Sequence, residues 1–415
     1  MLYSLMEGAR AAFSDPLART SAWGLEALDG AGSMWFPPEA RRMAQAWMEL
    51  THRLNKEYER PAWRVDAHES VVLAKPFCEL RRFAREGLAQ GAPRVLIVAP
   101  MSGHYATLLR DTVKAYVQDF EVFVTDWLNP RDIPIEAGEF DLRDYVDHVM
   151  EFSGLLSEKG ARPIHMVSVC QPTVPTLCAA AYLAEDGRGE EVASLVMVGG
   201  PIDARLSPTA PDNFATSHSI EWFESRLISQ VPWTRKGAGR SVYPGFLQHM
   251  GFVAMNPSRH KSSHREFFES LVRGDDEKAA KHREFYDEYN AVMDLPAPYY
   301  LQTIKKVFQD FDLARGRMEL RGRLVKPELI AKSALLTVEG ELDDISGAGQ
   351  THCAQGLCSG IAAKDREQFT APGVGHYGVF SGSRFRREVY PIMRDFIFAH
   401  DKGAAKAKRS GKPAA

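Results

Sequence analysis

Between residues 93 and 202 the sequence alternates short, continuously apolar runs with longer amphipathic stretches. The runs include PRVLIVAP (93–100), FEVFVTDW (120–127) and SLVMVGGPI (194–202). Strands that are apolar throughout are buried on both faces, as happens when helices cover both sides of a parallel sheet. The stretches at 105–117 and 142–160 have apolar residues at helical spacing. We therefore expect an α/β fold built on a mostly parallel sheet with helices on both faces.

This alternation is interrupted once, by a long stretch that is rich in aromatic residues and histidines and that we predict to be helical. Strands then resume with SALLTVEG (333–340), a helical GQTHCAQGLCSGI (349–361) and REQFTAPG (366–373). The simplest account is one core interrupted by a cap. The expected segments are an N-terminal helical extension (1–65) with a helix starting at Pro38, the first part of the core (66–204), a helical cap (205–330), the second part of the core (331–400) and a disordered basic tail (401–415).

Composition narrows the class of function. The chain has 51 basic and 54 acidic side chains and a formal net charge of -3, which gives no electrostatic footprint for nucleic acid. The sequence contains no run of about eighteen apolar residues, so we expect no membrane span. Charged residues such as Glu7 and Arg10 interrupt the first thirty positions, so we expect no signal peptide. Five cysteines, an odd number, fit a reduced, cytoplasmic protein.

The stretch HMVSVCQPTV (165–174) places a thiol where a buried strand meets a helix. Ser168-x-Cys170-x-Pro172 has the layout of a nucleophile elbow, although the usual flanking glycines are missing. Ser168 is small, and Pro172 suits the first turn of a helix because its missing N–H would have no partner there. A helix N-terminus stabilises a thiolate. Cys170 is therefore the candidate nucleophile.

Two further strand ends carry candidate catalytic residues. Asp343 follows the strand after the cap, in TVEGELDDI, and His376 follows the last strand, in APGVGHYGVF. The order nucleophile, acid, histidine is the order of α/β-hydrolases. His376 would exchange the proton and Asp343 would orient the imidazole. Asp344 is the alternative acid, and the spacing Gly-x-x-Asp after a strand favours Asp343.

An oxyanion hole needs backbone donors beside the nucleophile. The N–H of Gln171 is one candidate, and the turn after VLIVAP supplies Met101 or Ser102 as the second. Gly103 would let the chain pass close to the substrate. We expect no metal site and no cofactor.

Other motifs are interpreted as packing. The cysteines and histidine concerned are Cys78, Cys178, His352, Cys353 and Cys358, all in apolar surroundings. GVGHYG (373–378) matches the dinucleotide pattern but no helix of a βαβ unit follows it, so we reject that interpretation. The cap histidines are predicted to be surface or helix-capping residues: His249, His260, His264 and His282. The aromatic residues of the cap are predicted to be mostly core. Candidates for a substrate channel among them are Trp222, Trp233, Tyr243, Phe246, Tyr299 and Tyr300. Outside the cap, Tyr377 is a further candidate for contact with the substrate.

Four stretches together resemble a known family. VSVCQPTVPTLCAAAYLA, YLQTIKKVFQ, VEGELDDI and GVGHYGVFSG are similar to intracellular poly(3-hydroxybutyrate) depolymerases of the thiol type, which are relatives of polyhydroxyalkanoate synthases. The resemblance runs from about residue 65 to 400. It implies an α/β-hydrolase fold, a Cys-Asp-His triad that falls on Cys170, Asp343 and His376, and a polyester stored in cytoplasmic granules as substrate and partner.

The residues alone predict only a thiol acyl hydrolase or acyltransferase. The resemblance favours hydrolysis of poly(3-hydroxybutyrate) (PHB) at the granule surface. The alternatives are a synthase-like or coenzyme A-dependent acyltransferase with the same triad, and a granule-binding protein on an inert hydrolase fold.

Overall fold

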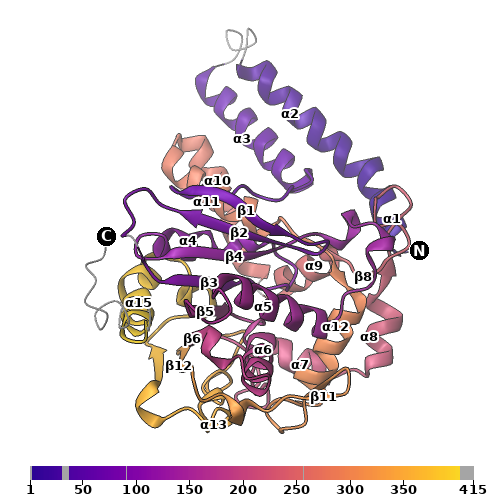
Figure 1. The fold of residues 1–415 in the computed structure, drawn as a ribbon. Helices are drawn as coiled ribbons and strands as arrows, with labels where there is room; N and C mark the ends of the chain where they lie inside the picture. Colours follow the sequence, from indigo (N-terminus) through magenta and orange to yellow (C-terminus); the bar gives the residue numbers. More distant parts are fainter. Residues whose placement is uncertain (1, 30–36, 90, 256, 402–415) are drawn as a thin grey trace.

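The computed structural model describes residues 2–29, 37–89, 91–255 and 257–401, and its centre is an eight-stranded sheet (Figure 1). The strands, in their order across the sheet, are β1 (His68–Ala74), β2 (Cys78–Ala84), β4 (Glu121–Trp127), β3 (Arg94–Val98), β5 (Ile164–Val169), β6 (Val192–Val198), β12 (Ala334–Gly340) and β13 (Arg366–Ala371). Strand β2 pairs antiparallel with β1 and β4, and all other neighbours are parallel. The predicted α/β fold with a mostly parallel sheet is confirmed.

Helices cover both faces of this sheet, which explains why its central strands are mostly apolar. On one face α4 (Arg110–Tyr116) packs against α15 (Tyr390–Ala399), with the rings of Tyr116 and Tyr390 4.9 Å apart. On the other face α5 (Leu142–Leu156) packs against α6 (Thr173–Glu185). Every residue of β5, β6 and β12 is buried. This rigid core fixes the positions of the loops at the carboxyl ends of the strands.

A long insertion, residues 199–333, separates β6 from β12. Its helices are α7 (Ala210–Thr216), α8 (Ile220–Leu227), α9 (Gly245–Met255), α10 (Pro257–Arg273), α11 (Asp276–Tyr289) and α12 (Ala297–Thr303). The prediction of an all-helical segment is wrong in part. The insertion also holds a sheet of β7 (Ser229–Gln230), β8 (Ser241–Tyr243) and β9 (Leu295–Pro296), and a pair of β10 (Glu319–Leu320) and β11 (Arg323–Leu324). Strands of two or three residues are too short to show a period of two in the sequence.

The helix predicted at 349–361 is also wrong, since only α13 (Ala354–Leu357) is helical there. Glycines explain the difference. Gly349 has a φ of +89°, in the left-handed region. A Cβ at Gly360 would lie 2.3 Å from the Glu328 carbonyl oxygen, so the chain passes too close for any side chain. Burial, rather than helical periodicity, produced the apolar pattern of this stretch.

The N-terminal helices form a pair that stands apart from the sheet (Figure 1). Helix α1 (Leu2–Ala9) continues through a π-helical turn (Arg10–Ser14) into α2 (Asp15–Asp29), and α3 (Pro38–Asn55) starts at Pro38 as predicted. We call residues 2–29 and 37–55 the N-terminal hairpin. Helix α3 packs on α10 of the insertion, where the rings of Trp47 and Phe268 lie 5.0 Å apart. Of the predicted basic tail, all but Asp401 lies outside the described residues.

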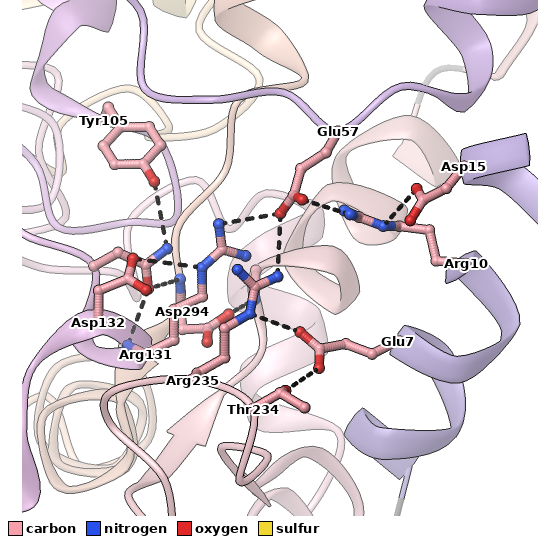
Figure 2. Close-up of polar contacts among 12 residues, drawn as sticks. Glu7, Arg10, Asp15, Glu57, Tyr105, Arg131, Asp132, Thr234, Arg235 and Asp294 are labelled. Atoms are coloured by element: carbon pink, nitrogen blue, oxygen red, sulfur yellow. Dashed lines mark hydrogen bonds and ion pairs between the residues drawn. The ribbon is translucent and has the colours of Figure 1, made fainter. Parts of the chain in front are cut away.

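A network of ion pairs joins the first helix to the body of the molecule (Figure 2). The carboxylate of Glu57 pairs with Arg10, with Arg131 at 3.4 Å and with Arg235 at 3.3 Å. Arg235 also pairs with Glu7 at 3.0 Å. Single half-exposed pairs contribute little to stability. A connected set restricts the orientation of the hairpin on the insertion. Within the described part of the chain, no helix is both long enough and apolar enough to cross a bilayer.

Candidate active site

Cys170 occupies the turn between β5 and α6. Its φ is +69°, a left-handed conformation that costs a residue other than glycine about 1–2 kcal/mol. The turn is held by two backbone hydrogen bonds: Cys170 N–H donates to the Val198 carbonyl at 2.7 Å, and Thr173 N–H donates to the Cys170 carbonyl at 3.1 Å. Such strain is kept where the surroundings enforce it, which is common at functional sites. The turn presents the thiol at the edge of the sheet, partly exposed.

The other four cysteines differ from Cys170. Cys78, Cys178 and Cys358 are buried, and burial raises the pKa of the Cys178 and Cys358 thiols to about 12. Cys353 is partly exposed, but burial of its sulfur and the nearby Asp203 raise the pKa of its thiol to about 11. Since the thiolate is the reactive form, these four thiols are suited to packing and not to nucleophilic attack.

Asp343 and His376 lie together after the ends of β12 and β13. His376 Nδ1 is 2.8 Å from Asp343 Oδ2. The second carboxylate oxygen, Oδ1, accepts the N–H groups of Ile345 at 2.9 Å and Ser346 at 2.8 Å. Both of its oxygens are thus oriented, and its side chain is only 1% exposed. The alternative acid, Asp344, is exposed to solvent.

The imidazole of His376 links the carboxylate to the thiol. Burial alone would lower the pKa of His376. The neighbouring Cys170, to which its side chain is hydrogen-bonded, and the Asp343 carboxylate outweigh burial and raise this pKa to about 10. The three side chains form a continuous series from thiol to imidazole to carboxylate. The raised pKa of His376 favours the imidazolium form at neutral pH.

Two glycines at the end of β6 make room for this series, and the sequence analysis missed both. Gly199 has a φ of +55°, and a Cβ there would lie 3.4 Å from Asp343 Oδ2 and 3.5 Å from His376 Nδ1. A Cβ at Gly200 would lie 1.8 Å from Thr173 Oγ1, at the start of α6. The Gly-Gly pair in SLVMVGGPI, at the end of an apolar strand, was the available signal.

The candidate oxyanion donors lie in two loops. The N–H groups of Gln171, Met101 and Ser102 donate to no other group within the described residues. Gln248 of α9 donates its side-chain N–H to the Ser102 carbonyl at 2.8 Å. The Gly103 carbonyl accepts the Met293 N–H at 2.7 Å. The insertion therefore holds the 101–103 loop while leaving its first N–H groups available.

The candidate substrate residues lie in different surroundings. Gly103 has a φ of +102°, and the Gln248 side chain fills the space that its Cβ would occupy. Tyr299 is buried, which raises the pKa of its phenol, and its hydroxyl lies beside the Gln171 side chain. Tyr377 follows His376 and is partly buried. Trp222 stacks on His218, with ring centroids 3.9 Å apart, inside the insertion.

The other aromatic candidates are spread over the insertion. The rings of Tyr243 and Tyr300 stack 4.1 Å apart, Phe246 packs on Tyr3, and Trp233 is exposed. A cavity of about 780 Å³ lies between the N-terminal hairpin and the insertion. Phe246 lines it, but none of the three catalytic candidates does. This cavity is therefore not the space in which the thiol would act.

The prediction that the cap histidines are surface or helix-capping residues is wrong. His249, His260, His264 and His282 are partly buried and lie within α9, α10 and α11. His260 Nδ1 is 2.9 Å from the Tyr286 hydroxyl, and the His282 ring stacks on Phe267 at 4.1 Å. Burial lowers the pKa of all four, to about 3 for His282. Aromatic neighbours, which the sequence alone did not bring together, hold these rings in place.

Fold and site together define the class of protein. The molecule has a mostly parallel sheet with helices on both faces, a sharp turn with a cysteine after β5, and an acid and a histidine after β12 and β13. These are the features of an α/β-hydrolase. The chain has this fold. Residues 199–401 match the family model described as PHB de-polymerase C-terminus. Over this stretch the chain is similar to the PHB depolymerases, and this similarity supports a carboxylic ester hydrolase.

Solved structures with a similar fold are distant in sequence. The α/β hydrolase GrgF from Penicillium sp. sh18 is 16% identical over 80% of this chain and 98% of its own, with a TM-score of 0.46. An esterase from Thermogutta terrifontis is 16% identical over 81% and 99%, with a TM-score of 0.41. A hydrolase from Pseudomonas aeruginosa PA01 is 13% identical over 80% and 98%, with a TM-score of 0.43. No curated protein matches the chain. Because these scores are below 0.5, the fold is identified from the sheet itself.

Proposed function

We propose that this protein hydrolyses the ester bonds of stored PHB, releasing 3-hydroxybutyrate or its oligomers, with Cys170 as nucleophile. The observation that carries the proposal is the series of Cys170, His376 and Asp343 in contact at the carboxyl edge of the sheet. The family match supplies the polyester. The place of action is then the surface of the polymer granule in the cytoplasm.

In the acylation step the Cys170 sulfur attacks the ester carbonyl carbon. A C–S bond forms, the ester C–O bond breaks, and the His376 imidazolium gives its proton to the departing alkoxide, which leaves as a hydroxyl end. The product is a thioester between Cys170 and the acyl part of the chain. The N–H groups of Gln171 and of Met101 or Ser102 stabilise the negative oxygen of the tetrahedral intermediate.

In the deacylation step His376 is neutral and acts as a base. It takes a proton from water as the water oxygen attacks the thioester carbonyl carbon, and the C–S bond breaks. The carboxylic acid leaves, and the Cys170 thiolate and His376 imidazolium are restored. Asp343 remains ionised throughout, holds the imidazole in orientation and stabilises its positive form. The scheme uses no cofactor.

Product analysis on amorphous PHB granules, with and without coenzyme A, tests the proposal. The wild type should release hydroxy acid, and Cys170→Ala should reduce the rate by at least 10³-fold, as expected when a nucleophile is lost. Cys353→Ala, which changes another partly exposed thiol, is the matched control and should retain activity. Iodoacetamide should inactivate the wild type, and serine-directed phosphonates should act poorly.

Three results would contradict the proposal. Polymer growth without release of acid, from hydroxyacyl-CoA, would indicate a synthase. Products that appear only as coenzyme A thioesters would indicate an acyltransferase. Unchanged turnover by Cys170→Ala would remove the thiol from the mechanism.

A further inference from the structure

The N-terminal hairpin exposes an unusual amount of apolar surface. Eight of the twenty-one large apolar side chains that are exposed in the described structure belong to residues 2–55: Leu5, Met6, Phe13, Leu17, Trp23, Met43, Trp47 and Leu54. The most exposed are Phe13, at 71%, and Trp23, at 72%. A soluble domain usually buries side chains of this size, and large contiguous apolar patches mark interaction sites.

The outer face of the first helix carries no charge. Its exposed residues between positions 4 and 17 are Ser4, Leu5, Met6, Gly8, Ala9, Ala11, Ala12, Phe13, Pro16 and Leu17. The three charged residues of the same stretch, Glu7, Arg10 and Asp15, are partly buried and take part in the network of Figure 2. Arg10 pairs with Asp15 at 3.3 Å and with Glu57. Between positions 4 and 17 the face offered to solvent is therefore apolar and neutral, and the exposed charges of α2 lie beyond it, at Arg19, Glu26 and Asp29.

The size of this surface is sufficient for stable attachment. Large apolar and aromatic side chains present roughly 150–250 Å² each when fully exposed. The exposed fractions of these eight side chains then amount to about 10³ Å². This total is summed over the helices of the hairpin; a single apolar patch of a typical monomer is about 300–600 Å².

The chemistry of the face favours one occupant. Helices that bind anionic membranes place several lysines and arginines beside their apolar face, whereas the exposed residues from 4 to 23 include a single cation, Arg19. A polyester has no charge and only hydrogen-bond acceptors, so a neutral apolar surface suits it. A polyester is also the substrate of the proposed function, which the family match supports.

The hairpin is also attached to the part of the molecule that borders the candidate active site. Helix α3 packs on α10 of the insertion. The same insertion holds the loop of Ser102 and Gly103, through Gln248 and Met293. We propose that the exposed apolar face of the N-terminal hairpin, centred on Phe13, Leu17 and Trp23, docks the enzyme on the surface of its solid polyester substrate. This inference rests on the proposed function.

Replacing Phe13, Leu17 and Trp23 together by serine tests the proposal on the full chain. We expect the triple variant to lose at least tenfold in binding to amorphous PHB particles by cosedimentation, and to lose polymer hydrolysis in proportion. Its kcat/KM on a soluble ester such as p-nitrophenyl butyrate should stay within twofold of wild type. The control changes three exposed apolar residues outside the hairpin, Ile135, Leu155 and Leu324, to serine. It should bind polymer as wild type does.

The outcomes separate docking from catalysis. Cys170→Ala should bind the particles normally and hydrolyse nothing, so failure of the catalytic proposal leaves the binding result readable. Equal binding by the hairpin variant and the wild type would overturn the inference. A wild-type dimer that the triple variant converts to a monomer in light scattering, with polymer binding retained, would assign the face to a second copy. Binding of wild type to neutral phosphatidylcholine vesicles but not to polymer would assign it to a membrane. Either result would overturn the proposal.

Discussion

Replacing Gly200 by alanine would test how the end of β6 fixes the nucleophile turn. The new Cβ would lie 1.8 Å from Thr173 Oγ1, 2.4 Å from its Cγ2 and 2.5 Å from its Cβ. Rotating the Thr173 side chain cannot relieve a clash with its own Cβ, so the backbone must move. Thr173 is fully buried, begins α6 and lies three residues after Cys170. Any movement of α6 therefore displaces the turn that carries the thiol.

The expected loss in the free energy of unfolding follows from overpacking of the core, which costs about 1–3 kcal/mol. We expect the upper end of this range, near 3 kcal/mol, because both contacting segments belong to the buried core. Urea unfolding followed by circular dichroism measures it. We also expect kcat on a soluble ester to fall at least tenfold, since displacement by about 1 Å can cost 10²-fold in rate.

Gly199→Ala is the matched control. Its Cβ would meet only ordinary contacts, at 3.4–3.5 Å, so the left-handed φ of +55° is the main cost, about 1 kcal/mol. Thr173→Gly should recover part of the stability lost in Gly200→Ala, although the glycine alone costs about 1 kcal/mol in a helix. Additive losses in the double variant, or a wild-type urea midpoint for Gly200→Ala, would refute this account of the turn.

Two further predictions concern the acid and the histidine. Asp343→Asn should lower kcat by about 10²-fold or more, because the imidazole loses the charge that stabilises its positive form. The kcat of Asp344→Asn should stay within about threefold of wild type. Equal losses of kcat in the two variants would contradict the assignment of Asp343 as the acid. His376→Gln should lower the rate by about 10²-fold while binding to polymer is retained. Because the pKa of His376 is raised from 6.5 to about 10, its protonated pair stabilises the fold fully below pH 6.5, and this contribution is lost as pH rises through about 10. The free energy of unfolding of wild type relative to His376→Gln should therefore decline over that interval, and iodoacetamide inactivation should vary less with pH in wild type than in the variant. A constant difference in stability across this range would contradict the charged pair.

The sheet was predictable because strands that are buried on both faces appear in the sequence as apolar runs. Strands β5, β6 and β12 are buried along their whole length and are mostly apolar, so their place in a covered parallel sheet follows from composition. The two- and three-residue strands of the insertion are too short to form such a run. The stretch at 349–361 buries Ala354, Cys358 and Ile361 with only four residues in a helix, which periodicity cannot distinguish at that length.

The candidate site was predictable only as strand ends. Which of two neighbouring aspartates meets His376 depends on a turn in which Asp343 accepts the N–H groups two and three residues ahead. This is the usual local bond of aspartate at a turn, and it was available in the sequence DDIS. The close approach of Gly199 to the Asp343–His376 pair joins segments more than 140 residues apart, so only the folded chain reveals it.

The bond between Tyr3 and Asp294 has a consequence for anyone who handles this enzyme. The Tyr3 hydroxyl donates to the Asp294 carboxylate at 2.8 Å, and the preceding residue, Met293, donates to the carbonyl of Gly103. Asp294 is almost completely buried. Trimming the first helix would leave that carboxylate without one of its donors, at a cost of about 1–3 kcal/mol. In a shortened protein, weaker attachment to the polymer could not be separated from a loosened loop at Gly103. Purification tags therefore belong at the other end of the chain.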